Sequence, residues 1–313
     1  MNRQDHVFVA GSDTLIGQAL YRQLEARGYA AIHGTRAGEP DLTDKNAVEA
    51  LFEKIKPDFV FLVAGMSGGV SANIKYPADL MLDNLLIECQ VMRSAHRYGT
   101  RKLMYFASSC SYPRSCPQPM RVESLMSGPL EPTNEAFATA KIAGIKLCQA
   151  YRAQYGTNMI TVIPANVFGP GDDFSTEDSH VIAALMTKMH RAKASGTDAV
   201  EVWGSGSPRR EFVFADDVAD AAIFLMSEYS SEMPINVGIG SEVSIREIAE
   251  AIQQIVGYQG SLKFNASLPD GMPMKMLDST PLIAMGWQPK FSLRAGLEAT
   301  YRWFIEADGR CDS

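Results

Sequence analysis

The chain has 313 residues, and its 29 Lys and Arg against 36 Asp and Glu give a formal net charge of −7. That length allows one large domain or two smaller ones, and 46% hydrophobic residues exclude wholesale disorder. The acidic balance argues against a nucleic-acid or anionic-membrane partner, and with no run of 18 apolar residues and no signal-peptide core we expect a cytoplasmic protein.

Short apolar runs alternate with longer helical patterns through residues 1–165. The runs cover 7–10, 59–64, 103–107 and 159–163, and the helical patterns lie near 15–27, 44–54, 78–98 and 135–155. Successive apolar positions are typical of strands that are covered on both faces, and runs this short do not suit a buried helix. The alternation predicts an α/β fold with a Rossmann-type doubly wound parallel sheet, so that residues 1–165 form a dinucleotide-binding domain.

The pattern loosens after residue 165. A turn at 169–171 precedes a helix that is expected from about Ser179, whose side chain can serve as the N-cap. Strands are expected at 200–203, 212–214 and 235–237, and helices near 217–228, 245–256 and 293–306. Residues 166–313 are therefore predicted to form mainly a smaller substrate-binding lobe, with part of the chain returning to the sheet domain.

A glycine-containing segment stands where the first strand turns into the first helix. It reads Gly11, Ser12, Asp13, Thr14, Leu15, Ile16 and Gly17, with Thr14 in the place of the middle glycine of the extended GxxGxxG spacing. Backbone N–H groups of such a turn can bind a pyrophosphate at the helix N-terminus, although an ordinary strand–helix turn is the alternative. Arg36 follows the second strand without an acidic neighbour, which favours NADP(H) over NAD, whereas Asp13 would repel a 2′-phosphate.

Neither the cysteines nor the histidines show the spacing of a structural site. The five cysteines are scattered without a CxxC pair, which argues against a disulfide framework and against a zinc site. The five histidines lack metal-ligand spacing, so no metal is expected. A free cysteine is most often a small buried hydrophobe. A chemical role for one of these residues therefore needs support from the motifs around it.

Several longer motifs go beyond a generic dinucleotide-binding fold. They are Ser108–Pro113, Leu130–Glu135, Ala140–Cys148, Asp178–Ile182, Val202–Ser207, Arg210–Phe212, Asp216–Asp217 and Pro269–Gly271. With these motifs the chain closely resembles GDP-L-fucose synthases, which are extended short-chain dehydrogenase/reductases that act on GDP-4-keto-6-deoxymannose. The resemblance covers nearly the whole chain. It implies NADP(H) as the cofactor and a GDP-linked 4-keto-6-deoxy-sugar as the substrate.

The resemblance also implies roles for individual residues. By position, Cys110 matches the base that removes protons at C3 and C5 beside the C4 ketone, and His180 matches the acid that returns them on the opposite face. The implied cofactor contacts are Gly11, Ser12, Asp13, Thr14, Leu15, Ile16, Gly17, Arg36, Phe106, Ala107, Ser108, Ser109, Lys141, Pro164, Ala165, Asn166, Val167 and His180. The implied substrate contacts are Lys188, Trp203, Arg210 and Asp270. Without the resemblance, the two cations among them would be ordinary solvated residues and the tryptophan a core residue.

The reductive half of the family reaction normally requires Ser, Tyr and Lys, with the last two spaced as YxxxK on one helix face. This chain has Ser108 and Lys141, but Phe137 stands at the tyrosine position. Phenylalanine has no ionisable proton for the C4 alkoxide, and losing a positioned acid typically costs roughly 10²–10⁴-fold in rate. We therefore predict C3/C5 epimerisation with impaired or absent C4 reduction. As a purely structural residue, Phe137 would be a plain core aromatic.

Two other interpretations of this departure stay open. One is a full epimerase-reductase in which another group supplies the proton, and the other is a catalytically lapsed GDP-sugar-binding protein. Ala136, Thr139 and Phe214 also depart from the family pattern, as do Thr14 and Asp13. Departures that are spread over the cofactor loop and the active helix favour natural divergence over an engineered substitution at Phe137.

A homodimer is expected from the two long helices near 78–98 and 135–155. Relatives in the family that the chain resembles pair two such helices per subunit across a dimer interface. Ala140, Ala143 and Gly144 give a small-residue face that would let helices of two subunits approach closely, unless this face packs on the subunit's own sheet.

Overall fold

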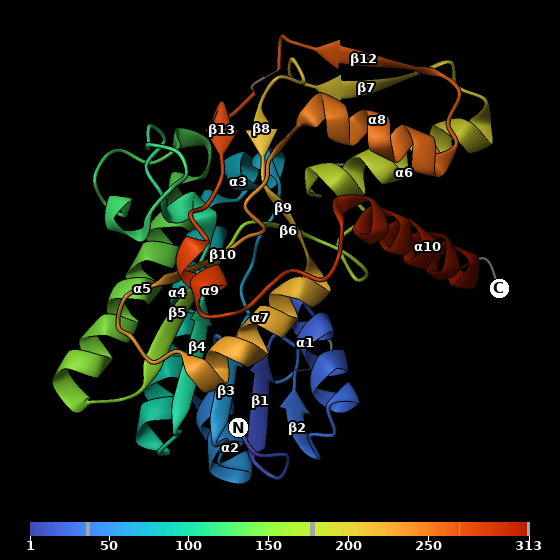
Figure 1. Ribbon diagram of the computed structural model, residues 1–313. Coiled ribbons are helices and arrows are strands. Elements are labelled where there is room, and N and C mark those ends of the chain that lie inside the picture. The colour runs from blue at the N-terminus through green and yellow to red at the C-terminus, as the bar shows by residue number, and fades with distance from the viewer. Residues whose placement is uncertain (36–37, 176–178, 269, 312–313) are drawn as a thin grey trace.

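A parallel six-stranded sheet forms the centre of the computed structural model, which describes residues 1–35, 38–175, 179–268 and 270–311 (Figure 1). The strands are β1 (His6–Ala10), β2 (Ala31–Gly34), β3 (Phe59–Leu62), β4 (Lys102–Phe106), β5 (Met159–Pro164) and β10 (Ile235–Val237). They lie in the order β10-β5-β4-β3-β1-β2, and every neighbouring pair is parallel. β3, β4 and β5 are buried along their whole length, as expected of strands that are covered on both faces. The predicted fold class is confirmed.

Helices cover the two faces of this sheet. They are α1 (Leu15–Ala26), α2 (Lys45–Ile55), α4 (Pro77–Arg97), α5 (Glu135–Tyr155) and α7 (Ala215–Glu228), while the short α3 (Val70–Lys75) packs against α4. α1 packs against α7, which crosses in front of the strands in Figure 1, and α4 packs against both α5 and α2. Side-chain caps define two of the helix starts, because Thr14 accepts a hydrogen bond from the N–H of Gly17 and Asp44 caps α2 in the same manner.

The chain after β5 builds a smaller lobe beyond the carboxyl ends of the central strands (Figure 1). Its elements are β6 (Asn166–Phe168), α6 (Val181–Ser195), β7 (Ala199–Trp203), β8 (Arg209–Arg210), β9 (Phe212–Phe214), β11 (Val243–Ser244), α8 (Ile245–Val256), β12 (Ser261–Asn265), β13 (Met274–Lys275) and α10 (Leu293–Cys311). β6 pairs with β9 and β7 with β12, while β8 lies between β11 and β13. Apolar side chains of α6, α8 and α10 form a hydrophobic core that is separate from the core of the sheet.

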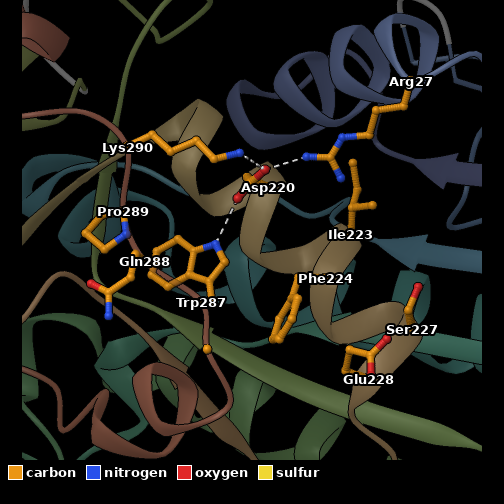
Figure 2. Close-up of a pocket in the computed structure, with 11 residues that line it drawn as sticks. Arg27, Asp220, Ile223, Phe224, Ser227, Glu228, Trp287, Gln288, Pro289 and Lys290 are labelled. Carbon is orange, nitrogen blue, oxygen red and sulfur yellow. Dashed lines mark hydrogen bonds and ion pairs between the residues drawn. The ribbon is translucent and has the colours of Figure 1, made fainter.

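A carboxylate on α7 holds the last part of the chain against the sheet domain (Figure 2). After α9 (Thr280–Ala284), which packs against β10, the chain runs along α7. Asp220 accepts hydrogen bonds from Trp287 Nε1 at 2.9 Å and from Lys290 Nζ at 2.5 Å, and it pairs with the Arg27 guanidinium of α1. These residues line an open groove of about 550 Å³. The segment that contains Trp287 and Lys290 is thereby held against both α7 and α1.

One local expectation from the sequence is wrong, and one open alternative is decided. α6 begins at Val181 with His180 as its N-cap, so Ser179 stands one residue too early to cap it. Ala140 and Gly144 are buried within the subunit, which is the alternative to a dimer face that the sequence left open. The reason lies in the subunit's own sheet, since a Cβ at Gly144 would stand only 2.4 Å from the hydroxyl oxygen of Tyr105 on β4.

Candidate active site between the sheet and the C-terminal lobe

The loop between β1 and α1 has the close backbone approaches that a dinucleotide-binding turn requires. Gly11 has a φ of +89°, and a Cβ there would lie 2.6 Å from the backbone of Ala64, which follows β3. A Cβ at Gly17 would lie 1.8 Å from the carbonyl oxygen of Gly11. Thr14 has a φ of −78° and needs no glycine, because its hydroxyl donates to the Gly11 carbonyl and accepts from the Gly17 N–H. The missing middle glycine therefore leaves the turn intact.

The Asp13 carboxylate turns toward the end of β2. It accepts hydrogen bonds from the Thr35 hydroxyl at 3.0 Å and from the backbone N–H of Gly38 at 3.1 Å. In dinucleotide-binding sheets, an acid near the end of the second strand binds ribose hydroxyls, whereas a nearby cation accommodates a 2′-phosphate. Asp13 therefore places negative charge at the adenosine end of the loop. Arg36, which the sequence assigned to a 2′-phosphate, lies outside the described residues.

Cys110 lies in a short 3-10 turn (Ser109–Ser111) directly after β4. Its Sγ accepts from Asn134 Nδ2 at 3.2 Å and from Lys275 Nζ at 3.4 Å. Burial acts to raise the pKa of the thiol, but the Lys275 ammonium, the Ser108 hydroxyl and the Arg210 guanidinium together lower that pKa below its ordinary value of 9.0. The surroundings of this thiol therefore favour the thiolate, which is the form that can act as a base or a nucleophile.

His180 interacts with the same lysine. It is the N-cap residue of α6. Desolvation lowers the pKa of the imidazole below the ordinary 6.5, Asp173 acts against this effect, and Lys275 adds to it. Cys110 and His180 thus both lie within the electrostatic reach of Lys275, although they come from different halves of the chain.

Phe137 and Lys141 stand one turn apart on α5, and both side chains are buried. Lys141 Nζ lies 5.7 Å from the centroid of the Phe137 ring, so the helix brings the two residues to one surface as their spacing predicts. Lys141 Nζ donates to Glu88 Oε1 at 3.1 Å. Ser108, at the start of the 3-10 turn, accepts a hydrogen bond from the backbone N–H of Cys110. The lysine therefore has a carboxylate partner and an apolar ring beside it, but no phenol at position 137.

The other residues assigned to the cofactor cluster at the carboxyl ends of β4 and β5. Phe106 ends β4, with Ala107 directly after it and Ser109 in the following 3-10 turn. Pro164 ends β5, with Ala165 directly after it and Asn166 and Val167 in β6. The Ala165 N–H donates to the Val237 carbonyl at 2.9 Å, and Asn166 Nδ2 donates to the Glu211 carbonyl at 2.9 Å. In open α/β sheets, ligands bind outside the carboxyl ends of the strands. The predicted cofactor residues thus lie at the expected edge of the sheet.

Three of the four residues assigned to the substrate come together where β7 and β8 end. Asp270 accepts hydrogen bonds from the Ser205 N–H at 2.7 Å and from the Ser205 hydroxyl at 2.8 Å. Arg210 Nη2 donates to the Asp270 carbonyl at 3.4 Å, and the Trp203 side chain is 46% exposed beside this loop. Lys188 is half-buried on α6, and the described residues show no contact between it and these three.

Sequence reasoning missed three residues that contact the candidate catalytic groups, namely Lys275 and Asn134 beside Cys110 and Glu88 beside Lys141. Lys275 is 8% exposed and lies in the two-residue strand β13, and its one sequence signal was the Asp270–Gly271 motif a few residues before it. Asn134 lay inside a recognised motif but was given no role. Glu88 sits in the middle of α4, where an acidic residue looks like an ordinary helix residue.

Some kinds of site are absent from the part of the chain that the structure describes. No group of three or more His, Cys, Asp or Glu side chains is arranged to hold a metal ion there. Cys89, Cys110, Cys116 and Cys148 are free thiols. None of the helices in these ranges combines the length and the apolar composition that crossing a membrane requires.

Known proteins match the chain over its whole length. A sequence model of the NAD dependent epimerase/dehydratase family matches residues 7–239. Probable GDP-L-fucose synthase 1 of Oryza sativa subsp. japonica is 49% identical over 301 residues, which cover 96% of this chain and 92% of that protein. GDP-L-fucose synthase of Escherichia coli (strain K12) is 44% identical over 319 residues, covering 99% of each. The chain belongs to the GDP-L-fucose synthase family. The resemblance that the motifs indicated is confirmed.

Solved structures agree with this membership. A GDP-6-OMe-4-keto-L-xylo-heptose reductase from C. jejuni superposes with a TM-score of 0.92 at 32% identity, covering 98% of this chain and 99% of that one. A GDP-L-fucose synthetase from Naegleria fowleri, solved with NADP bound, superposes with a TM-score of 0.90 at 28% identity over 99% and 95% of the two chains. The protein is thus an enzyme of the nucleotide-sugar epimerase/reductase class within the extended short-chain dehydrogenase/reductase superfamily.

Proposed function

We propose that this member of the GDP-L-fucose synthase family epimerises C3 and C5 of a GDP-linked 4-keto-6-deoxy-sugar through Cys110 and His180, and reduces C4 weakly or not at all. One contrast carries the proposal. Cys110 has an ammonium group 3.4 Å from its sulfur, whereas position 137, beside Lys141, holds a phenylalanine that cannot ionise. The groups that epimerisation needs are present, and the acid that reduction needs is missing.

The cofactor is NADP(H), the dinucleotide that the Naegleria fowleri relative holds. The residues present fit it, because Gly11 lets the loop approach the backbone of Ala64 and Gly17 lets the start of α1 approach Gly11, so that backbone N–H groups can meet a pyrophosphate there. Lys141 would hold the nicotinamide ribose, and residues 164–167 would line the nicotinamide. When bound, NADPH supplies the hydride for C4.

The epimerisation half needs a base and an acid on opposite faces of the sugar ring. A hydrogen beside the C4 ketone is acidic because the resulting enolate spreads its negative charge onto the C4 oxygen. The Cys110 thiolate takes that proton, and Asn134 and Lys275 hold the sulfur in place. His180 returns a proton on the other face. The Lys275 ammonium also lies close to where negative charge develops, which stabilises the enolate.

The reductive half keeps its positioning residues and lacks its proton donor. An alkoxide at C4 requires a proton, and Phe137 has none to give. Ser108 and Lys141 remain to orient the C4 oxygen and the cofactor. We infer slow reduction on this ground, and net oxidation of NADPH at a family-like rate would instead indicate that another group supplies the proton.

The substrate end supports a GDP-linked sugar. Arg210 and Lys188 can neutralise a diphosphate, and the exposed face of Trp203 offers a flat surface for a ring. Relatives at 44% and 49% identity are named GDP-L-fucose synthases, whereas the heptose reductase from C. jejuni is 32% identical. These identities favour a 4-keto-6-deoxyhexose over a heptose.

We also propose that the enzyme is a homodimer formed through α4 and α5. The two helices pack against each other, and Leu82 on α4 and Tyr155 on α5 leave 57% and 52% of their surfaces exposed. Apolar side chains on a paired-helix surface suit a second copy of the same pair. Within each subunit, residues 1–165 would be mainly the NADP-binding domain and residues 166–313 mainly the substrate lobe. A monomeric mass by light scattering at micromolar concentration would contradict the dimer.

One incubation tests the activity. The protein is mixed with GDP-4-keto-6-deoxymannose and NADPH in D₂O, and deuterium at C3 and C5 is read by mass spectrometry while absorbance follows NADPH. Deuterium uptake with little NADPH oxidation supports the proposal. Uptake with rapid oxidation indicates a full epimerase-reductase, and neither signal indicates a GDP-sugar-binding protein.

A further inference from the structure

A buried polar network surrounds the Lys141 ammonium. Glu88 on α4, Tyr105 on β4 and Lys141 on α5 are 1%, 0% and 6% exposed. Glu88 Oε1 accepts hydrogen bonds from the Tyr105 hydroxyl at 2.6 Å and from Lys141 Nζ at 3.1 Å. A single carboxylate oxygen thus joins a strand and two helices underneath the proposed active site.

Two features of this network are unfavourable for the stability of the fold. A buried ion pair is often no more stable than apolar side chains of the same volume would be, because both charges lose their hydration. Gly144 lies in the interior of α5, where glycine weakens a helix, and a Cβ there would stand 2.4 Å from Tyr105 Oη and 2.7 Å from Glu88 Oε2. The glycine makes room for the pair. Stability alone does not account for this arrangement.

The Lys141 ammonium has donors left over for a ligand. A Cβ on Gly65, in the loop after β3, would lie 3.3 Å from Nζ, so the ammonium reaches the carboxyl edge of the sheet. Among the described residues, Glu88 is the one hydrogen-bond acceptor that the structure gives Nζ. An ammonium has three N–H donors, so two remain. Phe137 offers them only the face of its ring.

The titratable groups around Glu88 are suited to keeping it paired. Lys141 and Cys148 face it from α5, Tyr105 faces it from β4, and Cys89 adjoins it on α4. Burial raises the pKa of Glu88, while Lys141 and Tyr105 lower it. Burial, reinforced by Glu88, raises the pKa of Tyr105 well above its ordinary value, and burial raises the pKa of Cys148 to about 12. Near neutral pH the phenol therefore stays protonated and donates to Glu88.

We propose that Glu88 is a positioning residue which, with Tyr105, directs the Lys141 ammonium at the ribose hydroxyls of NADP(H). This inference rests on the proposed function, because the ribose is the acceptor that it invokes. Without the carboxylate, the ammonium loses the charged acceptor that fixes its direction, and it becomes a less well-directed donor.

The test is the affinity for NADPH. NADPH dissociation constants are measured by calorimetry at pH 7 for the parent and for Glu88→Gln. We expect Glu88→Gln to bind about tenfold more weakly, because the Lys141 ammonium loses the charged acceptor that directs it. Asp220→Asn is the matched control, since it removes a carboxylate that pairs with Arg27 and Lys290 at the end of α1 and should leave the affinity unchanged.

Two further variants separate position from charge. Glu88→Asp keeps the charge on a shorter side chain and should restore most of the affinity. Tyr105→Phe keeps both charges and should weaken binding only a few-fold, and it carries the test if Glu88→Gln does not fold. A Glu88→Gln variant, or in its absence a Tyr105→Phe variant, that matches the parent in affinity overturns the inference. A parent that does not bind NADPH overturns the proposed function, and with it the inference, so the two failures are distinguished by the parent alone.

Discussion

The epimerisation and reduction sides of the candidate active site each place a lysine beside an acidic group. They differ in whether that acidic group is itself the proposed reacting group. On the first side, Lys275 lies 3.4 Å from the sulfur of Cys110, and the sulfur is the proposed reacting atom. On the second, Lys141 pairs with Glu88 beneath the site, and the neighbouring ring of Phe137 has no proton to transfer. The residues that position the reactants are thus distinct from the residues that transfer a proton. One chemical step can therefore become slow while the residues that position its reactants remain in place.

The largest effect should come from removing the base on the epimerisation side. Cys110→Ala should lower deuterium exchange at C3 and C5 by roughly 10²–10⁴-fold, because the variant removes the proposed base. Mass spectrometry in D₂O measures this, and NADPH affinity serves as the control that should stay constant. Exchange at the parental rate would mean that the base is a different residue and that the two sides are not divided as described.

The reverse change on the reduction side should give a gain. Phe137→Tyr places a phenol beside Lys141 and Ser108, and we expect reduction of C4 to rise about 10²-fold, near the lower end of the range for a positioned acid. Deuterium exchange through Cys110 should change little. The comparison breaks if this variant folds and binds NADPH yet reduces no faster, or if the parent already reduces at a rate typical of its family.

Lys275 can be tested through the reactivity of the thiol. Lys275→Met removes the ammonium that most lowers the pKa of Cys110, so the pKa should rise and the thiolate fraction at pH 7 should fall about tenfold. Since only the thiolate reacts, alkylation by iodoacetamide should slow by the same factor, and its pH profile should move to higher pH. Lys263→Met, on the exposed surface of β12, is the control. An unshifted profile would show that Lys275 does not activate the thiol.

Asp13 should have the smallest effect and should act on one side alone. Asp13→Arg replaces a carboxylate at the adenosine end of the loop with a cation, and NADPH affinity relative to NADH should rise severalfold. Calorimetry with both cofactors measures this ratio. Because the proposed epimerisation uses Cys110 and His180 rather than the adenosine end, deuterium exchange should not change. Equal affinities for the two cofactors in this variant would mean that Asp13 does not face the 2′ position.

The central sheet could be predicted because its buried strands are continuous apolar runs, as at 59–62 and 102–106. β8 and β13 could not be predicted, since two residues have no hydrophobic period. Lys275 was missed for the same reason, because its contact with Cys110 spans 165 positions and exists only once β13 pairs with β8. The start of α6 was predicted one residue early, at a place where neighbouring residues compete as caps.

The catalytic candidates show a similar division. Cys110, His180 and Lys141 were found because they lie in motifs, and the structure gives Cys110 and His180 a common electrostatic partner in Lys275. Thr14 was interpreted as a departure from the glycine-loop pattern, but whether a position needs glycine depends on its φ and on the space for a Cβ, which a sequence does not reveal. The observed φ of −78° and the capping hydroxyl make threonine suitable there. Glu88 gave no signal, since its burial is a property of the packed helices.

One edge strand of the central sheet, β10, comes from a segment that lies far beyond β5 in the chain. The elements from β6 to α7 lie between the two strands in the sequence. A polypeptide that stopped at residue 165 would leave one edge of β5 without a hydrogen-bonding neighbour, and α1 would lose the cover of α7. Unpaired edges of apolar strands recruit other chains. If the chain is divided after residue 165, the two fragments should therefore fold by complementing each other. Neither fragment should fold as an autonomous unit.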